Sequence, residues 1–126
     1  MTDLNDITYE IRRAIFTVHN ELGPGLLESV YEAALSQELM DSELHVQTQV
    51  PLPVKYKNHY LELGFRVDML IENEIIIEVK SIEALNNVHK KQLLTYLKLS
   101  NKKIGLLVNF NVEKLIDKES LIRIIN

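Results

Sequence analysis

The chain has 126 residues, of which 46% are hydrophobic and 25% are charged, and its formal net charge is −4 at pH 7. This composition is typical of a globular protein, and the negative balance argues against a protein that coats nucleic acid through bulk positive charge. The absence of cysteine excludes disulfides, thiolate metal sites and thiol catalysis, and the four histidines show no paired ligand spacing that would indicate structural zinc.

The length is that of one domain with a core of its own, so we expect a single domain over residues 1–126. No apolar run approaches membrane-spanning length, and no signal peptide opens the chain. We therefore expect a cytoplasmic protein with no membrane partner.

Helical spacing of apolar residues predicts an amphipathic helix over roughly residues 4–22, which Gly23-Pro24-Gly25 ends. A second helix is predicted to begin just after Gly25, and a third covers residues 88–99.

Alternation of apolar and polar residues predicts the strands. Pro51 and Pro53 in the first strand are typical of an edge or a bulge, and Gly64 allows a bend in the second. The predicted strands cover residues 46–56, 60–71, 75–80, 103–109 and 121–125. This order predicts an α/β fold with a mixed sheet, in which an antiparallel meander is followed by a helical crossover back to the sheet.

Residues 66–80 are predicted to form a tight hairpin around the loop Glu72-Asn73-Glu74. Ile71 then pairs with Ile75, and Asp68 lies opposite Glu78. Alternation places one set of residues on a wholly apolar face: Val67, Met69, Ile71, Ile75, Ile77 and Val79. The other face begins with Leu70 and Ile76 and continues with Asp68, Glu78, Arg66 and Lys80.

Two carboxylates on adjacent strands, Asp68 and Glu78, can bind a hard divalent cation such as Mg²⁺. Lys80 projects to the same side, where it can orient or deprotonate a metal-bound water or stabilise charge growing on a phosphate. Arg66 can clamp a phosphate oxygen. The alternative is a cross-strand ladder of salt bridges, Asp68 with Lys80 and Glu78 with Arg66, and the hairpin alone favours neither interpretation.

Gln92 and Tyr96 lie four residues apart on one face of the third helix, with His89 on the same side. This face can turn toward the acids, where Gln92 can hold a water or phosphate and Tyr96 can donate its hydroxyl. Taken alone, Tyr96 is as readily an aromatic residue at the core edge, Gln92 a surface residue and His89 a helix cap.

Glu28 falls in the first turn of the second helix, with Tyr31 one turn further on. An acid there can simply complement the helix dipole, and Tyr31 can be a core residue. We assign no role to Glu32.

Together, these motifs resemble the GxxExxY family, which is assigned to the PD-(D/E)XK nuclease superfamily. The resemblance rests on Gly25-x-x-Glu28-x-x-Tyr31, Asp68, Glu78-x-Lys80 and Gln92-x-x-x-Tyr96, and it runs from roughly Leu4 to Phe110. It implies a restriction-endonuclease-like core, with a central mixed β-sheet flanked by helices and an extra N-terminal helix.

The resemblance also implies roles for single residues. Glu28, Asp68, Glu78 and the Val79 carbonyl would bind Mg²⁺ or Mn²⁺, and Lys80, Gln92 and Tyr96 would be catalytic. The implied function is hydrolysis of phosphodiester bonds of nucleic acid, with DNA as the expected substrate.

Arg66, Lys90 and Lys91 are the expected contacts to nucleic acid, and Lys55 and Lys57 are further candidate positions for such contacts. One alternative is a catalytically silent module that keeps the fold and binds protein or nucleic acid, which the acidic balance favours. Hydrolysis of a smaller phosphate ester is another. The apolar first helix and residues 121–125 can serve a homodimer as well as the core.

Overall fold

A computed structural model describes residues 3–126, with the side chains of residues 62 and 63 left out. Its helices are α1 (Leu4–Leu22), α2 (Glu28–Asp41) and α3 (Asn87–Ser100). Its strands are β1 (Val46–Tyr56), β2 (His59–Ile71), β3 (Ile75–Lys80), β4 (Ile104–Asn109) and β5 (Leu121–Ile125). The predicted elements are confirmed in type and order, and α2 begins slightly later than predicted.

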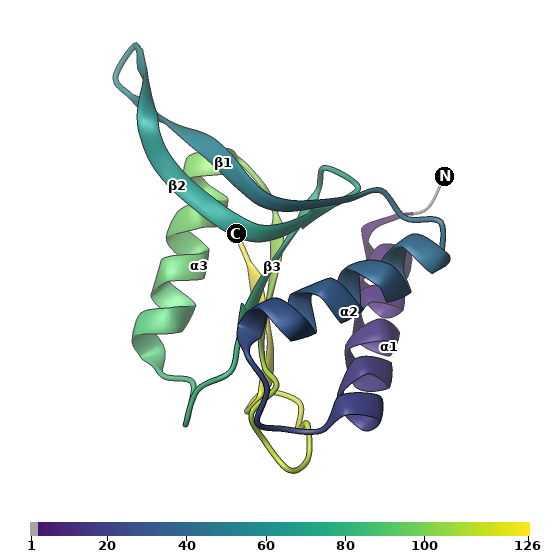
Figure 1. The fold of residues 1–126 in the computed structure, drawn as a ribbon. Coiled ribbons are helices and arrows are strands. Elements are labelled where there is room, and N and C mark those ends of the chain that lie inside the picture. Colours follow the sequence, from purple (N-terminus) through teal and green to yellow (C-terminus); the bar gives the residue numbers. More distant parts are fainter. Residues whose placement is uncertain (1–2) are drawn as a thin grey trace.

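The five strands form one sheet in the order β1-β2-β3-β4-β5. β3 and β4 are parallel and are joined through α3, whereas the other neighbouring pairs are antiparallel. Figure 1 shows α1 and α2 together on one side of the sheet and α3 on the other. The predicted α/β fold, a meander followed by a helical crossover, is therefore confirmed. No helix among residues 3–126 is long and apolar enough to cross a membrane.

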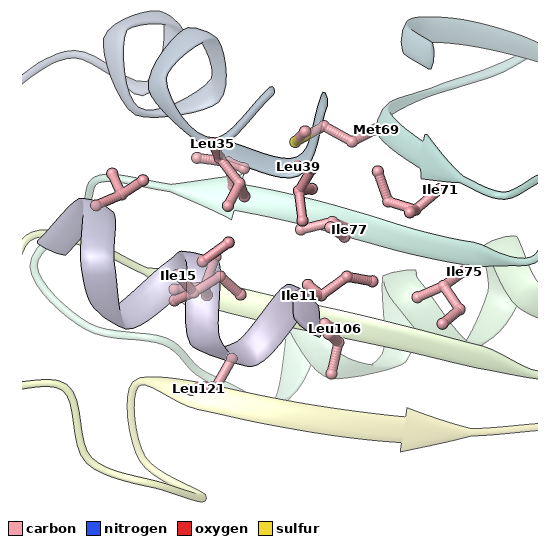
Figure 2. Packing of buried hydrophobic residues seen from close by; sticks show 14 of the residues in the cluster. Ile11, Ile15, Leu35, Leu39, Met69, Ile71, Ile75, Ile77, Leu106 and Leu121 are labelled. Carbon is pink, nitrogen blue, oxygen red and sulfur yellow. The ribbon is translucent and has the colours of Figure 1, made fainter. Parts of the chain in front are cut away.

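Each face of the sheet has its own hydrophobic core. On one face, Ile11 and Ile15 of α1 and Leu35 and Leu39 of α2 pack against the sheet, as Figure 2 shows. On the other face a smaller cluster joins Leu93 and Leu97 of α3 to four residues of the sheet, Val67, Leu70, Ile76 and Leu107. Because both faces are covered, β3 and β4 are buried almost throughout, and polar groups on them need partners.

The β2–β3 hairpin has the predicted register, with Ile71 opposite Ile75 and the loop at residues 72–74. The prediction of one apolar face is confirmed for five of its six residues but is wrong for Val67, which belongs to the α3-side core. The regular pairing of β2 with β3 ends at Met69, and therefore the alternation of the hairpin does not extend to Val67.

The β1–β2 pair is longer than the rest of the sheet, and β1 is an edge strand with an irregularity between Leu52 and Val54. Both features that the two prolines indicated are present. Gly64 lies opposite this irregularity, where an added Cβ would be only 2.0 Å from the carbonyl oxygen of Leu52. Only glycine fits this close approach of the two backbones.

Candidate active site

Asp68 and Glu78 lie side by side at the point where the pairing of β2 with β3 ends. The amide of Asp68 donates to Glu78 Oε2 at 2.9 Å, and the amide of Val79 donates to Asp68 Oδ2 at 2.8 Å. The two carboxylates therefore replace the next backbone hydrogen bonds of the ladder. This contact confirms that the two acids are neighbours across the hairpin.

The alternative ladder of salt bridges is not formed. Among the described residues, the ion pairs within 4.0 Å are Arg12–Asp117, Arg13–Glu10 and Arg13–Glu38, and none of them involves the hairpin acids. The carboxylates of Asp68 and Glu78 are thus held by backbone amides and not by the neighbouring Arg66 and Lys80.

Glu78 is the most strongly perturbed acid of this site. Its side chain is buried, with the residue only 6% exposed. Burial, and secondly the negative charge of Asp68, raise its pKa from 4.5 to about 7, and Glu28 adds to the same effect. The amide of Asp68 and the charge of Lys80 oppose the rise in pKa but do not cancel it. The site therefore holds more negative charge than its own cations compensate.

Glu28 reaches the same end of the sheet from α2. It lies in the first turn of this helix, as predicted, and its Oε2 accepts a hydrogen bond from the amide of Ser81 at 2.9 Å. The Ser81 hydroxyl donates in turn to the carbonyl of Leu26 at 2.6 Å. The start of α2 is therefore fastened to the residue that follows Lys80, which fixes Glu28 beside the end of β3.

Tyr31 supports this arrangement from the core. Its hydroxyl donates to the carbonyl of Gly23 at 2.5 Å and accepts from the amide of Leu26 at 3.1 Å. Its ring is fully buried and stacks on Phe110, with the centroids 4.5 Å apart. Tyr31 is therefore a core residue that shapes the turn before Glu28, which agrees with the structural interpretation of this position.

The α3 face that carries Tyr96 is turned toward the acids. Burial raises the pKa of Tyr96, the charges of Glu78 and Asp68 raise it further, and a hydrogen bond with Gln92 opposes the rise. The Tyr96 ring stacks on Phe65 of β2 with centroids 4.3 Å apart, which holds the side chain at the sheet. The structure thus brings Tyr96 near the acids, whereas Gln92 is exposed and interacts with Tyr96.

His89 has a different place on α3. Its Nδ1 accepts a hydrogen bond from the amide of Asn86 at 3.1 Å, while the Asn86 side chain caps the first turn of the helix. His89 is therefore a capping residue, which is the structural interpretation given above.

Asn109 contributes to the site, and the sequence analysis did not identify it. This buried residue at the end of β4 holds the backbone of Ile82: Asn109 Oδ1 accepts from the Ile82 amide at 3.1 Å, and Nδ2 donates to its carbonyl at 3.0 Å. It positions the segment that follows Lys80. A polar residue that ends an otherwise apolar strand was the available signal.

Glu32, to which the sequence analysis assigned no role, lies within electrostatic reach of Asp68. It lies one turn after Glu28, is half-buried, and its carboxylate accepts two contacts from Gln49 Nε2, at 3.1 and 3.2 Å. Burial raises the pKa of Glu32, and the charge of Asp68 raises it further, whereas Gln49 opposes the rise. Its i, i+4 spacing from Glu28 was the signal in the sequence.

The cations are less tightly placed than the acids. Lys80 is half-buried, and its charge acts on Glu78. Arg66 and Lys91 are exposed, and Lys90 is half-buried. Among the described residues, no salt bridge connects Arg66, Lys90 or Lys91 with the acids. Their contacts to nucleic acid stay predictions.

The donor chemistry of the acids suits a hard divalent cation. No group of three His, Asp or Glu side chains in the described part of the chain has metal-ligand spacing. However, Mg²⁺ is commonly held by one or two carboxylates together with water and substrate phosphates. Glu28, Asp68 and Glu78 each use one oxygen for a backbone amide, and no described residue donates to the other oxygen. Uncompensated negative charge and available oxygens both fit a cation at this place.

Comparison with known proteins agrees with this geometry. The chain matches the family model of the PD-(D/E)XK nuclease superfamily over residues 5–124, a range that contains every candidate site residue. Searches of curated proteins and of solved structures returned no match. The match confirms the resemblance at the level of the superfamily, and the narrower GxxExxY assignment stays a prediction. The mixed sheet with helices on both faces is consistent with a restriction-endonuclease-like core.

Proposed function

The chain belongs to the PD-(D/E)XK nuclease superfamily, and from this premise we propose that it hydrolyses phosphodiester bonds of nucleic acid, with DNA as its substrate. The reaction uses a water molecule activated by a divalent cation, Mg²⁺ or Mn²⁺. The membership supports nuclease activity in general, and the geometry of the acids supports the assignment of this activity to one site.

The observation that carries the proposal is the buried carboxylate of Glu78 beside Asp68. Burying a carboxylate next to another one is unfavourable unless a cation or a proton compensates the charge. Burial, and secondly the charge of Asp68, raise the pKa of Glu78 to about 7, which reflects this cost. Such surroundings destabilise the folded chain when no cation is present, so stability alone does not account for Glu78. A carboxylate that binds a cation does account for it.

Glu28, Asp68, Glu78 and the carbonyl of Val79 would hold the cation. When bound, a divalent cation lowers the pKa of a coordinated water and polarises the phosphate. The chain itself supplies rigid ligands, because backbone amides of β2, β3 and the segment after β3 each fix one oxygen of an acid. Binding therefore requires little reorganisation of these side chains.

Lys80, Gln92 and Tyr96 would act on the reacting groups. The Lys80 ammonium lies within electrostatic reach of Glu78, where it can orient the attacking water or offset negative charge that grows on the phosphate. Tyr96 lies within electrostatic reach of the acids, and it and its partner Gln92 can donate hydrogen bonds to a phosphate oxygen. Arg66, Lys90 and Lys91 would contact the nucleic-acid backbone.

The test is incubation of the pure protein with single- and double-stranded DNA and RNA, in Mg²⁺, in Mn²⁺ and in EDTA. We expect metal-dependent cleavage of DNA that falls at least about 100-fold in Asp68→Ala and in Lys80→Ala, the loss typical for removal of a group that stabilises a transition state. Asp41→Ala and Lys118→Ala, at exposed positions, are the matched controls, and Lys118 lies beside Arg12 and Asp117. Absence of cleavage in every condition, or equal rates in all variants, would refute the proposal.

A catalytically silent module is the second candidate, and one observation favours it. In the described part of the chain no three acids have metal-ligand spacing, and every acid of the site already accepts a backbone hydrogen bond. Calorimetric titration with Mn²⁺ distinguishes the two functions. Binding that is lost in Glu78→Ala supports the enzyme, and no binding to the wild type supports the module. Turnover of nucleotides without cleavage of polymers would indicate a smaller phosphate ester as substrate.

We also propose that residues 1–126 act as one domain in the cytoplasm. Both a monomer and a homodimer agree with this function, and sedimentation velocity of the full chain separates them.

A further inference from the structure

The β1–β2 ribbon extends well past the rest of the sheet. β1 has 11 residues and β2 has 13, whereas β3 has six and pairs only with residues 69–71 of β2. The base of the ribbon packs on the α3-side core through Val50, Leu52 and Phe65. Beyond it, residues 54–61 form an arm tip that projects from the body in Figure 1. Apart from the half-buried Val54, every side chain of this tip is exposed.

The charge of the arm tip is opposite to that of the whole chain. Residues 50–61 contain two of the 14 basic residues, Lys55 and Lys57, and none of the 18 acidic ones. The tip also contains His59, which is positively charged when it is protonated. A basic tip on a protein of net charge −4 is complementary to a polyanion.

Two tyrosines dominate the exposed surface of the tip. Tyr60 is 70% exposed and Tyr56 is 58% exposed. Lys55 is paired with Tyr60 and Tyr56 with His59, so the tyrosines lie on opposite faces of the ribbon. Each ring has a lysine nearby: Lys55 Nζ is 5.9 Å from the Tyr60 centroid, and Lys57 Nζ is 5.4 Å from that of Tyr56.

An aromatic ring beside a cation is the combination that contacts a base and its phosphate together. A ring can stack only on a base whose face is free, and in a duplex the base faces are buried by their neighbours. The tip packs on no described core residue, and its tyrosines and lysines therefore belong to neither hydrophobic core. An isolated two-stranded ribbon is only marginally stable, so burial does not account for these side chains.

We propose that the arm tip binds single-stranded nucleic acid, with Tyr56 and Tyr60 stacking on bases and Lys55 and Lys57 contacting phosphates. The inference rests on the proposed function in that the bound strand would be the substrate. Tyr60 and Asp68 are on the same strand, at most about 27 Å apart at the usual rise per residue, and the bend at Gly64 shortens this distance. The arm would hold a strand whose next segment reaches the acids.

The test measures binding without cleavage. Fluorescence anisotropy with a labelled single-stranded oligonucleotide, in EDTA, gives the dissociation constant of the full chain. We expect the double variant Tyr56→Ala/Tyr60→Ala to bind at least fivefold more weakly, since one stacked base contributes roughly five- to 150-fold in affinity. Tyr56→Phe/Tyr60→Phe keeps both rings and should bind within about twofold of the wild type. Tyr9→Ala, at a tyrosine of α1 that is 66% exposed, is the matched control.

The lysines are tested by salt dependence. Lys55→Ala/Lys57→Ala should reduce the slope of log affinity against log salt by about 1.4, which corresponds to two phosphate contacts on a single strand. Lys114→Ala/Lys118→Ala, at exposed positions between β4 and β5, should leave the slope unchanged. Circular dichroism of every variant verifies that the fold is kept.

The outcomes separate this inference from the proposed function. Unchanged affinity of the tyrosine variant overturns the inference, even if Asp68→Ala abolishes cleavage. No binding of a single strand by the wild type, or an equal loss of duplex and single-strand binding in the variant, also overturns it. Self-association of the wild type that the tyrosine variant lacks would assign the tip to a second copy of the chain instead. Tyrosine-dependent binding by a protein that cleaves nothing would support the arm and contradict the enzyme.

Discussion

Replacing Glu78 by glutamine should stabilise the metal-free protein at alkaline pH. The carboxyl of Glu78 has a pKa of about 7 in the folded chain and 4.5 as its ordinary value, chiefly because it is buried. Between these two pH values the folded state binds the proton more tightly than the unfolded state. The stability contributed by this proton is fully present below pH 4.5 and is lost as the pH rises through 7.

The size of this effect follows from the same two values. One unit of pKa difference corresponds to about 1.4 kcal/mol, so the interval from 4.5 to about 7 amounts to roughly 3 kcal/mol. Glutamine is neutral at every pH and keeps an oxygen that can accept from the amide of Asp68. Glu78→Gln should therefore exceed the wild type by less than about 1 kcal/mol at pH 5 and by roughly 3 kcal/mol at pH 8.

The assay is urea denaturation in EDTA at several pH values between 5 and 8, followed by circular dichroism. Glu74→Gln, at an exposed position in the loop of the same hairpin, is the matched control and should follow the wild type at each pH. Adding Mg²⁺ at pH 8 should stabilise the wild type and leave Glu78→Gln nearly unchanged. A difference between Glu78→Gln and wild type that stays constant from pH 5 to pH 8 would refute the assigned cause.

Three further substitutions test the surroundings of the site by denaturant unfolding. Tyr31→Phe keeps the buried ring but removes the hydroxyl bonded to the turn before α2, and should lower the free energy of unfolding by about 1 kcal/mol. Asn109→Ala leaves the amide of Ile82 without its acceptor, while the Ile82 carbonyl keeps Asn111 Nδ2, and should lower it by about 2 kcal/mol, with reduced cleavage. Gly64→Ala puts a methyl group 2.0 Å from the carbonyl oxygen of Leu52 and should destabilise the ribbon by about 2 kcal/mol.

The fold was predictable because most of its determinants are local. Alternation and helical spacing placed the strands and helices, and the register of the β2–β3 hairpin followed from its short loop. The meander and the crossover then left few ways to order the strands. Asp68 and Glu78 could be identified as neighbours for the same reason, since a hairpin fixes its partners within a dozen residues.

Features that depend on distant contacts could not be predicted. The predicted alternation was wrong at Val67, because the regular strand pairing has already ended there. It ends where the Glu78 carboxylate, and not a backbone carbonyl, accepts the hydrogen bond of the Asp68 amide. Asn109 holds Ile82, and Glu32 lies within electrostatic reach of Asp68, across separations of many residues. No local pattern specifies such pairs. A polar residue in a buried strand and an acid at helical spacing indicate only that a partner is needed.

The hydrogen bonds that close the β2–β3 pairing link the chemistry of the site to the backbone. The amides of Asp68 and Val79 have carboxylate oxygens as acceptors, whereas the ladder further along the hairpin has carbonyl oxygens. Whatever changes the charge of these carboxylates, a proton or a cation, also changes the strength of two main-chain bonds. The two amides are therefore built-in reporters: their exchange rates and nitrogen chemical shifts register occupancy of the site without any label. The same coupling makes the end of this hairpin the part of the sheet whose stability depends on what the acids hold.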